Sequence, residues 1–314
     1  MSVIIVSWNV RNLLVKCLEA LLSDNVSGGM AVQIIVVDNA SDDGSEDAAR
    51  AFHGVCTIQT GENLGYGKAN NRGFAEADGR YMLVLNPDTI PQPGSLRALL
   101  DFAEAHPQAG IVSPRLLNPD GTVQHAAFRF PTLVMAALDL FGLPEVIPGR
   151  LRLRLLDSGL NGRYTRETNT MEPFRIDHPL GACMLIRREL YERLGGFDPA
   201  IHMYSEEIEF ALRAARAGWE CWQVPEARVI HLGGQSTGQM PDRMYVELWR
   251  SRLYIYSNYH SKPAQLALRG LAAAAHLLKA LRILWQLSRG RIGRTEARRE
   301  WQRAGAIIRL VKSK

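Results

Sequence analysis

Continuous apolar runs alternate with helical patterns along the first hundred residues of the chain. Runs rich in β-branched residues, typical of strands buried on both faces, occupy residues 2–8, 32–38, 55–60 and 81–86. Apolar residues at helical spacing, acidic first turns or glycine-rich entries predict helices over residues 10–22, 45–52 and 65–77. This alternation predicts an α/β fold in which a mostly parallel, Rossmann-like sheet carries helices on its flanks.

The pattern becomes less regular after about residue 110. A Pro-Asp-Gly turn predicts a hairpin over 116–124, and the stretch 141–175, rich in Gly, Pro, Arg and Asn, is interpreted as a mobile or acceptor-side region. Order then returns: residues 181–197 are predicted to form a strand followed by a helix, 205–218 a second helix, and 221–231 an extended segment. We expect one domain over 1–260, with a nucleotide-binding half (1–110) and an acceptor and catalytic half (111–260).

The last fifty residues differ from the rest in charge. From Lys262 to the end the chain has 13 Lys and Arg and two acidic residues, whereas the preceding part is net acidic. Apolar residues lie on one helical face of 266–285, and the basic residues lie largely on the other. We therefore expect a basic amphipathic helical tail over 261–314.

A basic amphipathic helix with an interrupted apolar stretch is typical of a segment that lies on an anionic membrane surface. Packing of this helix on the body of the protein, or against a second copy in a homodimer, is the alternative. Nucleic acid is not an expected partner, because no recognised nucleic-acid-binding fold accompanies the basic residues.

Composition is ordinary for a globular protein with a sizeable core, at 46% hydrophobic and 22% charged residues over 314 positions. The four cysteines are far apart and form no C-x-x-C, so neither a zinc knuckle nor a disulfide framework is indicated. This favours a reducing, cytoplasmic setting. The N-terminus enters the first apolar run without a basic segment, so no secretory signal is expected.

Polar clusters follow the predicted strands, where parallel sheets commonly bind ligands. Asp38, Asn39 and Asp43 come after the second strand, and such groups either bind a base or ribose or stabilise a turn. Residues 61–73 combine glycines, which allow a ligand to approach the backbone closely, with the positive charge of Lys68. A solvated lysine in a structural turn is the alternative there.

Three further polar positions end or begin predicted elements. The proline between Asn86 and Asp88 cannot continue a ladder, so the fourth strand ends there, and the two polar residues either hold a divalent cation or cap a turn. Glu206 and Glu207 open a helix, where one could act as a base or both could occupy a first turn that favours acids. His231 ends the last extended segment at the same expected sheet edge, and a purely structural histidine is the alternative there.

The order of these clusters resembles that of family 2 glycosyltransferases, and most of all the rhamnosyltransferase-type subgroup of bacterial surface-polysaccharide enzymes. The resemblance covers about residues 2–260. The segments that carry it are SVIIVSWN (2–9), VVDNASDDGS (36–45), NLGYGKANNRGF (63–74), LNPD (85–88), the stretch 180–219 with its MYSEEIEF sequence, and VIHLGGQST (229–237).

The resemblance implies a GT-A fold, a nucleotide-diphosphate sugar donor, a divalent metal cofactor (Mg²⁺ or Mn²⁺) and inversion at the anomeric carbon. It implies that Asp38 contacts the nucleobase, that the backbone of Ser7 and Trp8 flanks it, and that Asn39 through Asp43 shape the same pocket.

On the diphosphate and sugar side, the resemblance implies contacts from Asn63, Gly65 and Asn71. Asn86 occupies the first position of the family's Asp-x-Asp motif. Metal binding is therefore expected mainly from Asp88.

His231 matches a family histidine near the metal and the leaving diphosphate. The family's Glu-Asp pair is Glu206-Glu207 here, so the base position implied by the resemblance holds Glu207, one methylene longer than the usual Asp. Whether Glu206 or Glu207 is the base stays open in the sequence.

We expect an inverting glycosyltransferase that moves a sugar from a nucleotide-sugar to a hydroxyl of a lipid-linked glycan during cell-surface polysaccharide synthesis. L-Rhamnose from dTDP-rhamnose is the best candidate for the donor. The expected location is peripheral, on the inner face of a bacterial-type cell membrane. The alternatives are a sugar nucleotidyltransferase, which would release pyrophosphate, and a non-catalytic nucleotide-sugar-binding protein.

Overall fold

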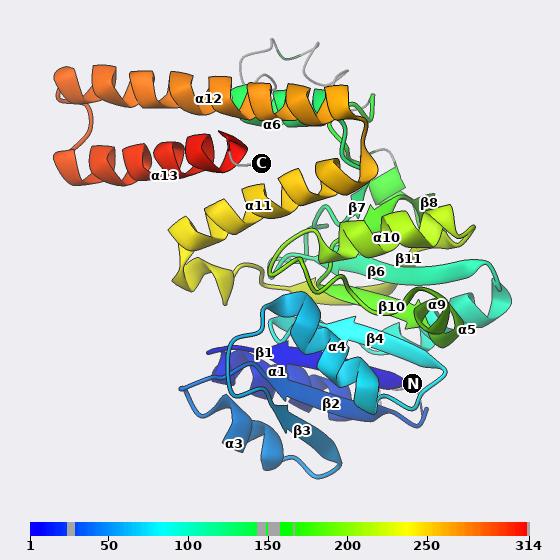
Figure 1. Cartoon of the computed structure of the whole chain (residues 1–314). Coiled ribbons are helices and arrows are strands. Elements are labelled where there is room, and N and C mark those ends of the chain that lie inside the picture. Colours follow the sequence, from blue (N-terminus) through cyan, green and yellow to red (C-terminus); the bar gives the residue numbers. More distant parts are fainter. Residues whose placement is uncertain (24–28, 143–148, 150–157, 166, 313–314) are drawn as a thin grey trace. The chain divides into compact units, whose positions relative to one another are not determined.

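The first hundred residues form the predicted alternation of strands and helices (Figure 1). The computed structural model describes residues 1–23, 29–142, 149, 158–165 and 167–312. The strands of this part are β1 (Ser2–Ser7), β2 (Gln33–Asp38), β3 (Val55–Gln59), β4 (Tyr81–Leu85) and β5 (Thr89–Pro91). The helices are α1 (Arg11–Leu22), α3 (Ser45–Arg50), α4 (Tyr66–Glu76) and α5 (Ser95–Ala105).

Among the later elements, the strand and helix within 181–197, the helix within 205–218 and the strand near 221–231 follow the predicted segments, whereas the strands at 127–128, 174–176 and 178–179 were not predicted. The strands are β6 (Ala109–Leu117), β7 (Ala127–Phe128), β8 (Phe174–Ile176), β9 (His178–Pro179), β10 (Cys183–Arg187) and β11 (Glu220–His231). The helices are η1 (Glu167–Asn169), α9 (Arg188–Leu194), α10 (Glu206–Arg216) and η2 (Thr237–Gln239). The predicted hairpin is confirmed by antiparallel pairing of Leu117 with Val123. Within the stretch 141–175, residues 143–148, 150–157 and 166 lie outside the described residues.

The central sheet has the order β3-β2-β1-β4-β10-β6-β11-β5, and β8 also pairs with β11. Strand β1 lies between β2 and β4 and runs parallel to both, β2 runs parallel to β3, and β6 runs parallel to β11. Strands β5, β8 and β10 run antiparallel to their neighbours. The mostly parallel α/β sheet predicted from the sequence is therefore confirmed.

Helices cover both faces of this sheet. Along β1, Val3 and Ile5 join the apolar core formed with α1, α3 and α5, whereas Ile4 and Val6 join the core formed with α4, α9 and α10. Successive side chains of a strand point to opposite faces, so a strand buried on both faces must be apolar throughout. Polar chemistry is thereby confined to the ends of the strands.

Contacts divide the chain into two compact units. The first comprises residues 1–130, 163–202 and 206–239, and the second comprises 131–162, 203–205 and 240–314. The sequence placed the start of the tail at residue 261, whereas the last segment of the second unit starts at residue 240 and residues 131–162 join it.

The second unit is helical. Its described helices are α6 (Leu133–Phe141), α11 (Pro241–Tyr259), α12 (Lys262–Ser288) and α13 (Arg294–Lys312). Trp249, Leu268 and Ile307 are buried in a core shared by α11, α12 and α13. A helical C-terminal tail is thus confirmed. Within the described residues, none of the helices has the length and apolar character needed to cross a membrane.

Candidate active site

The carboxyl ends of β1 and β2 bring two fully buried polar residues together. Ser7 pairs in register with Asp38, and neither side chain is exposed. Ser7 Oγ and Asp38 Oδ1 have no hydrogen-bond partner among the described residues. Buried polar atoms are nearly always paired in folded proteins, so two orphans side by side indicate a place for a polar ligand. Trp8 follows directly and is half-buried.

Asp38 and Asn39 also hold the loops around this strand end. Asp38 Oδ2 accepts a hydrogen bond from the N–H of Ser41 at 3.0 Å. Asn39 Oδ1 accepts from the N–H of Leu64 at 2.9 Å, and its Nδ2 donates to Asn63 Oδ1 at 3.2 Å. The turn after β2 and the loop before α4 are therefore fixed to each other by one amide side chain.

Asp43 caps two helices. One carboxylate oxygen accepts the N–H of Arg11 at 2.8 Å, and the other accepts the N–H of Ser45 at 3.0 Å. Burial alone would raise the pKa of Asp43, but these donors and the Ser45 hydroxyl lower it below its ordinary value. The side chain thus supports the predicted pocket by fixing the starts of α1 and α3.

Gly65 enters α4 in a conformation that only glycine adopts easily. Its φ is +82°, and a Cβ atom there would collide with the carbonyl oxygen of His202. The N–H of Tyr66 donates to the same oxygen at 3.0 Å. Gly65 therefore allows the loop to lie against the 202 segment, and Lys68, one turn further on, is exposed.

The predicted role of Asn71 at the diphosphate is not supported by its contacts. Its Nδ2 donates to the carbonyl oxygen of Phe197 at 2.7 Å, and its Oδ1 accepts the N–H of Phe197 at 2.9 Å. Both ends of the amide are used to fasten the 196–197 segment to α4. Sequence alone could not distinguish this structural use from a ligand contact.

Asn86 is tied to two other parts of the site through Tyr66. The Tyr66 hydroxyl lies 2.8 Å from Asn86 Oδ1 and 2.8 Å from the carbonyl oxygen of Gly181. The hydroxyl has one proton, so it donates to one oxygen only. Asn86 thereby acts as a fixed neutral neighbour of Asp88.

Asp88 and His231 face each other at the edge formed by β5 and β11. Both are at least 93% buried, and His231 Nε2 lies 3.5 Å from Asp88 Oδ1 without a hydrogen bond. His231 Nδ1 lies 2.7 Å from Gln124 Oε1. The amide end of Gln124 donates to Asn118 and to the His231 carbonyl oxygen, so its Oε1 is the acceptor and Nδ1 carries the proton.

Burial lowers the pKa of His231, although Asp88 opposes this, and the lowered pKa favours the neutral imidazole. In the neutral form with the proton on Nδ1, Nε2 presents its lone pair toward a carboxylate oxygen. Two electron-pair donors that face each other with no proton between them fit a shared cation. The described residues contain no group of three His, Cys, Asp or Glu side chains that could hold a metal. Any cation here would need ligands from a bound molecule or water.

The two glutamates at the start of α10 have different surroundings. Glu206 is 2% exposed, lies against Gly67, and leaves Oε1 unpaired among the described residues. Burial and the neighbouring Glu207 raise the pKa of Glu206 well above its ordinary value. Glu207 is partly exposed, and burial raises its pKa to about 7. A carboxyl with a pKa near neutrality can take up a proton at physiological pH.

Glu207 lies beside the backbone that Tyr66 binds. A Cβ atom at Gly181 would sit 3.6 Å from the Cβ of Glu207, so the carboxylate arm runs along this glycine. Tyr204 and Ser205 have φ values of +67° and +69° immediately before the helix. Consecutive residues in this region are costly for side chains other than glycine and cluster at functional sites.

Two residues of the site were not identified from the sequence. Tyr66 lies within the quoted glycine-rich segment, but its partners Asn86 and Gly181 are distant in the chain. Gln124 is the last residue of the predicted hairpin, yet its contact with His231 depends on the pairing of β6 with β11. No local pattern marks either side chain.

The fold and the site together define a GT-A-type enzyme: a mostly parallel sheet with polar groups at the strand ends and a carboxylate of raised pKa on a nearby helix. Two solved structures share the fold. One is the mannosyltransferase PcManGT from Pyrobaculum calidifontis in complex with GDP-Man and Mn²⁺, at a TM-score of 0.56 and 17% identity over 98% of this chain and 84% of that one. The other is GalNAc-T7 with UDP, GalNAc and Mn²⁺, at a TM-score of 0.55 and 18% identity over 81% of this chain and 49% of that one.

The chain belongs to glycosyl transferase family 2, because the sequence model of this family matches residues 2–195. A relative from Mycobacterium tuberculosis, N-acetylglucosaminyl-diphospho-decaprenol L-rhamnosyltransferase, is 31% identical over 264 residues, which cover 79% of this chain and 83% of the relative. Rhamnosyltransferase WbbL of Escherichia coli K12 is 26% identical, and the match covers 73% of this chain and 82% of WbbL. The protein is therefore a glycosyltransferase, and it is similar to enzymes of polysaccharide biosynthesis.

Proposed function

We propose that the protein is an inverting, metal-dependent glycosyltransferase that moves L-rhamnose from dTDP-rhamnose to a hydroxyl of a lipid-linked glycan. The single observation that supports it most is the partly exposed Glu207 carboxyl with a pKa of about 7. An acceptor hydroxyl needs a base that is unprotonated near neutral pH yet basic enough to take its proton.

Ser7 and Asp38 are proposed to bind the nucleobase. The unpaired hydroxyl of Ser7 can both donate and accept a hydrogen bond, and the unpaired Oδ1 of Asp38 can accept one. An acceptor oxygen matches the imide N–H of a thymine or uracil. Asn39 and Asp43 contribute indirectly, because they hold the loops on either side.

Asp88 and His231 are proposed to hold Mg²⁺ or Mn²⁺ together with the donor's diphosphate. The cation would act as a Lewis acid that neutralises the charge that develops on the leaving diphosphate. Within the protein, Gln124 keeps the Nε2 lone pair of His231 directed at this position. Asn86 cannot add a negative charge, so the carboxylate of Asp88 supplies the only anion of the Asn-Pro-Asp segment.

Glu207 is proposed to act as the general base in a single displacement. As the acceptor oxygen attacks the anomeric carbon, its proton passes to the carboxylate, the bond to the diphosphate breaks, and the configuration inverts. No carboxylate nucleophile is required. Glu206 is nearly inaccessible, and burial together with Glu207 raises its pKa well above the ordinary value, so Glu206 is less suited to the role than Glu207.

The donor and acceptor are inferred from relatives' names. The Mycobacterium tuberculosis relative is named for L-rhamnose transfer to N-acetylglucosaminyl-diphospho-decaprenol, and the Escherichia coli relative is named a rhamnosyltransferase. By analogy, this protein uses a polyprenyl-diphosphate-linked glycan as acceptor. An acceptor of this kind resides in a membrane, so the enzyme would act at the inner face of the cell membrane.

The test is incubation of the purified protein with dTDP-rhamnose, Mn²⁺ and a short-chain prenyl-diphosphate N-acetylglucosamine. We expect release of dTDP and an acceptor heavier by one deoxyhexose, detected by mass spectrometry. UDP-glucose and GDP-mannose serve as control donors. Formation of pyrophosphate from sugar 1-phosphate and a nucleoside triphosphate would instead identify a nucleotidyltransferase. Donor binding without turnover on any acceptor would identify a binding protein.

A further inference from the structure

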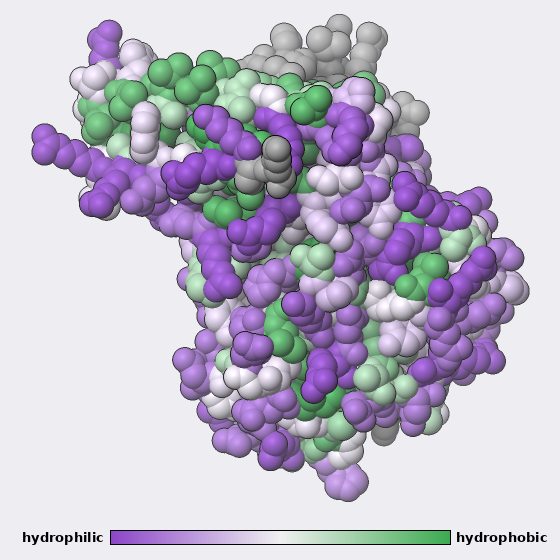
Figure 2. Space-filling view, viewed as in Figure 1, coloured by the Kyte–Doolittle hydropathy of each residue, from purple (hydrophilic) through white to green (hydrophobic). Residues whose placement is uncertain are grey.

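The outer face of α12 is apolar although it is exposed. Six large side chains lie on it at helical spacing and are 47–69% exposed: Leu266, Leu277, Leu278, Leu281, Leu284 and Trp285. We call these six residues the apolar face of α12. They make up more than half of the exposed large apolar residues in the described part of the chain. Figure 2 shows the hydrophobic surface gathered over this helix.

The charged side chains of α12 lie outside the apolar face. At 100° per residue, Lys279 falls on the opposite side of the helix, Arg269 and Arg282 fall on the two flanks of the apolar face, and no charged position falls on the apolar face itself between its ends. Arg269 donates to the carbonyl oxygen of Val311, and Lys279 pairs with Glu300 at 2.6 Å. The polar side of this amphipathic helix is thus directed at α13.

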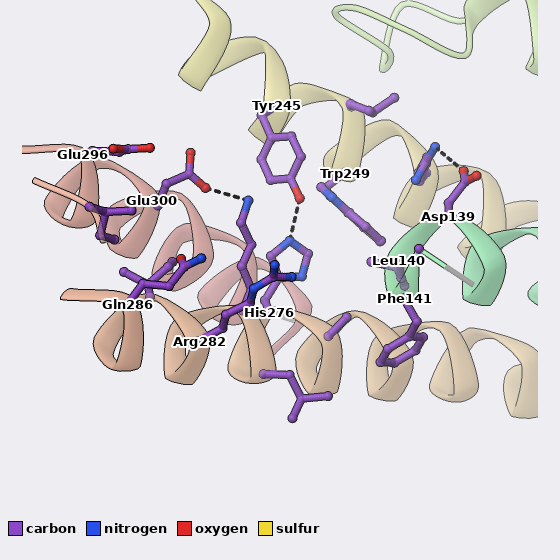
Figure 3. A pocket seen from close by; sticks show the side chains of 18 residues that line it. Asp139, Leu140, Phe141, Tyr245, Trp249, His276, Arg282, Gln286, Glu296 and Glu300 are labelled. Carbon is purple, nitrogen blue, oxygen red and sulfur yellow. Dashed lines mark hydrogen bonds and ion pairs between the residues drawn. The ribbon is translucent and has the colours of Figure 1, made fainter. Parts of the chain in front are cut away.

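Two basic side chains of α12 line a pocket within the second unit. Lys279 and Arg282 contribute to this pocket, which has a volume of about 840 Å³ and is bounded by α6, α11, α12 and α13 (Figure 3). The same pocket contains Glu296 and Glu300, and the Tyr245 hydroxyl lies 2.8 Å from His276 Nε2. Its basic groups are balanced by acids within the unit, so the pocket does not itself indicate an anionic ligand.

Basic residues cluster at one end of the apolar face. The guanidinium groups of Arg289 and Arg291 lie 6.0 Å and 4.8 Å from the ring centre of Trp285. Arg294 follows, and residues 286–295 contain no acid. A tryptophan with adjoining arginines at the edge of an apolar surface matches the boundary between acyl chains and anionic headgroups.

We propose that the apolar face of α12 docks into the surface of an anionic bilayer, with Trp285 at the interface and Arg289 and Arg291 on lipid phosphates. The helix lies in the surface, because it is not apolar enough to span the membrane. Charge complementarity selects a bilayer over a second copy of the chain, which would bring an equally basic segment. This docking concerns the second unit and does not depend on the transfer reaction.

Flotation of the full-length protein with phosphatidylcholine vesicles, with and without phosphatidylglycerol, tests the proposal. We expect flotation with the anionic vesicles, reduced but not abolished by high salt because the apolar contact is not screened. Leu277→Glu/Leu281→Glu should lower the partition coefficient by at least about ten-fold, since two buried leucine contacts are lost. Arg289→Ala/Arg291→Ala should remove the preference for anionic vesicles.

Leu22→Glu is the matched control, because Leu22 is similarly exposed on α1 in the first unit and should not affect flotation. Circular dichroism melting and dTDP binding confirm that each variant is folded. A wild-type protein that stays unbound at low salt, or a Leu277→Glu/Leu281→Glu variant that floats like wild type, overturns the proposal. If the wild type is unbound and sedimentation shows a dimer that this variant dissociates, the face binds a second copy instead.

Discussion

Glu206 and Glu207 are adjacent and chemically identical, yet their surroundings separate them. Glu206 is enclosed against Gly67, whereas Glu207 runs along Gly181 toward the Tyr66 and Asn86 contacts. The sequence left both as candidates for the base. Burial decides between them, because a proton acceptor must be reachable by the acceptor hydroxyl.

Glu207→Gln should reduce kcat by about 10²–10⁴-fold, since the amide keeps the shape of the side chain but cannot accept a proton. The dissociation constant for dTDP, measured by calorimetry, should not change. Glu206→Gln is the control: it places a neutral isostere at a position that the acceptor hydroxyl cannot reach, and it should keep most of the activity. If Glu206→Gln were inactive and Glu207→Gln active, Glu206 and not Glu207 would be the general base.

The pH dependence of kcat tests the environment of Glu207. Burial raises its pKa from 4.5 to about 7, and only the unprotonated form accepts a proton. Turnover should therefore fall about ten-fold per pH unit below pH 7 and level off above it. A profile that stays flat down to about pH 5 would show that the group responsible is an unperturbed carboxylate or a different residue.

Gln124 is predicted to direct His231 toward the cation. Gln124→Leu removes the acceptor for Nδ1–H, so the imidazole loses its fixed tautomer and orientation. Mn²⁺ affinity in the presence of dTDP, measured by electron paramagnetic resonance, should weaken about 10- to 100-fold. Gln124→Glu keeps an acceptor at the same place and should bind Mn²⁺ at least as well as wild type. If Gln124→Leu bound Mn²⁺ as tightly as the wild type, Gln124 would not be needed to orient His231.

At the scale of elements, the loop before α4 depends on Gly65. Gly65→Ala meets both a positive φ and a collision with the backbone of His202, and should lower the free energy of unfolding by about 2–4 kcal/mol. Gly61→Ala, in the same loop, has a φ of +76° and open space around it, so a loss of about 1 kcal/mol is expected. Urea denaturation measures both. Equal losses would show that the contact with His202 is not tight.

The elements that could be predicted are those with local signals. Apolar runs located β1 to β4, and the Pro-Asp-Gly turn located the hairpin after β6. Pairings between distant segments could not be predicted. The contact of Gln124 with His231 joins residues 107 positions apart, and the bonds of Asn71 to Phe197 join residues 126 apart. For this reason the sequence predicted Asp88 and His231 as candidate metal ligands but did not point to Gln124, whose amide contacts the histidine.

At the scale of the whole molecule, charge and composition identified the tail but not its extent. The basic composition starts near residue 262, whereas α6 and α11, which precede it, pack with the tail helices. Packing of α11 depends on apolar residues such as Trp249 and Leu253, which net charge does not reveal. The apolar stripe of α12 could be read from the sequence, but only the structure shows that it is the exposed side.

The stereochemistry of transfer tests the central claim most directly. The full-length enzyme is incubated with dTDP-rhamnose and a prenyl-diphosphate N-acetylglucosamine acceptor, and the anomeric carbon of the product is assigned by its one-bond carbon–hydrogen coupling in NMR. Single displacement with Glu207 as base predicts a product whose anomeric configuration is opposite to that of the donor. A product with the donor's configuration would contradict the account, because it requires a second displacement at the anomeric carbon.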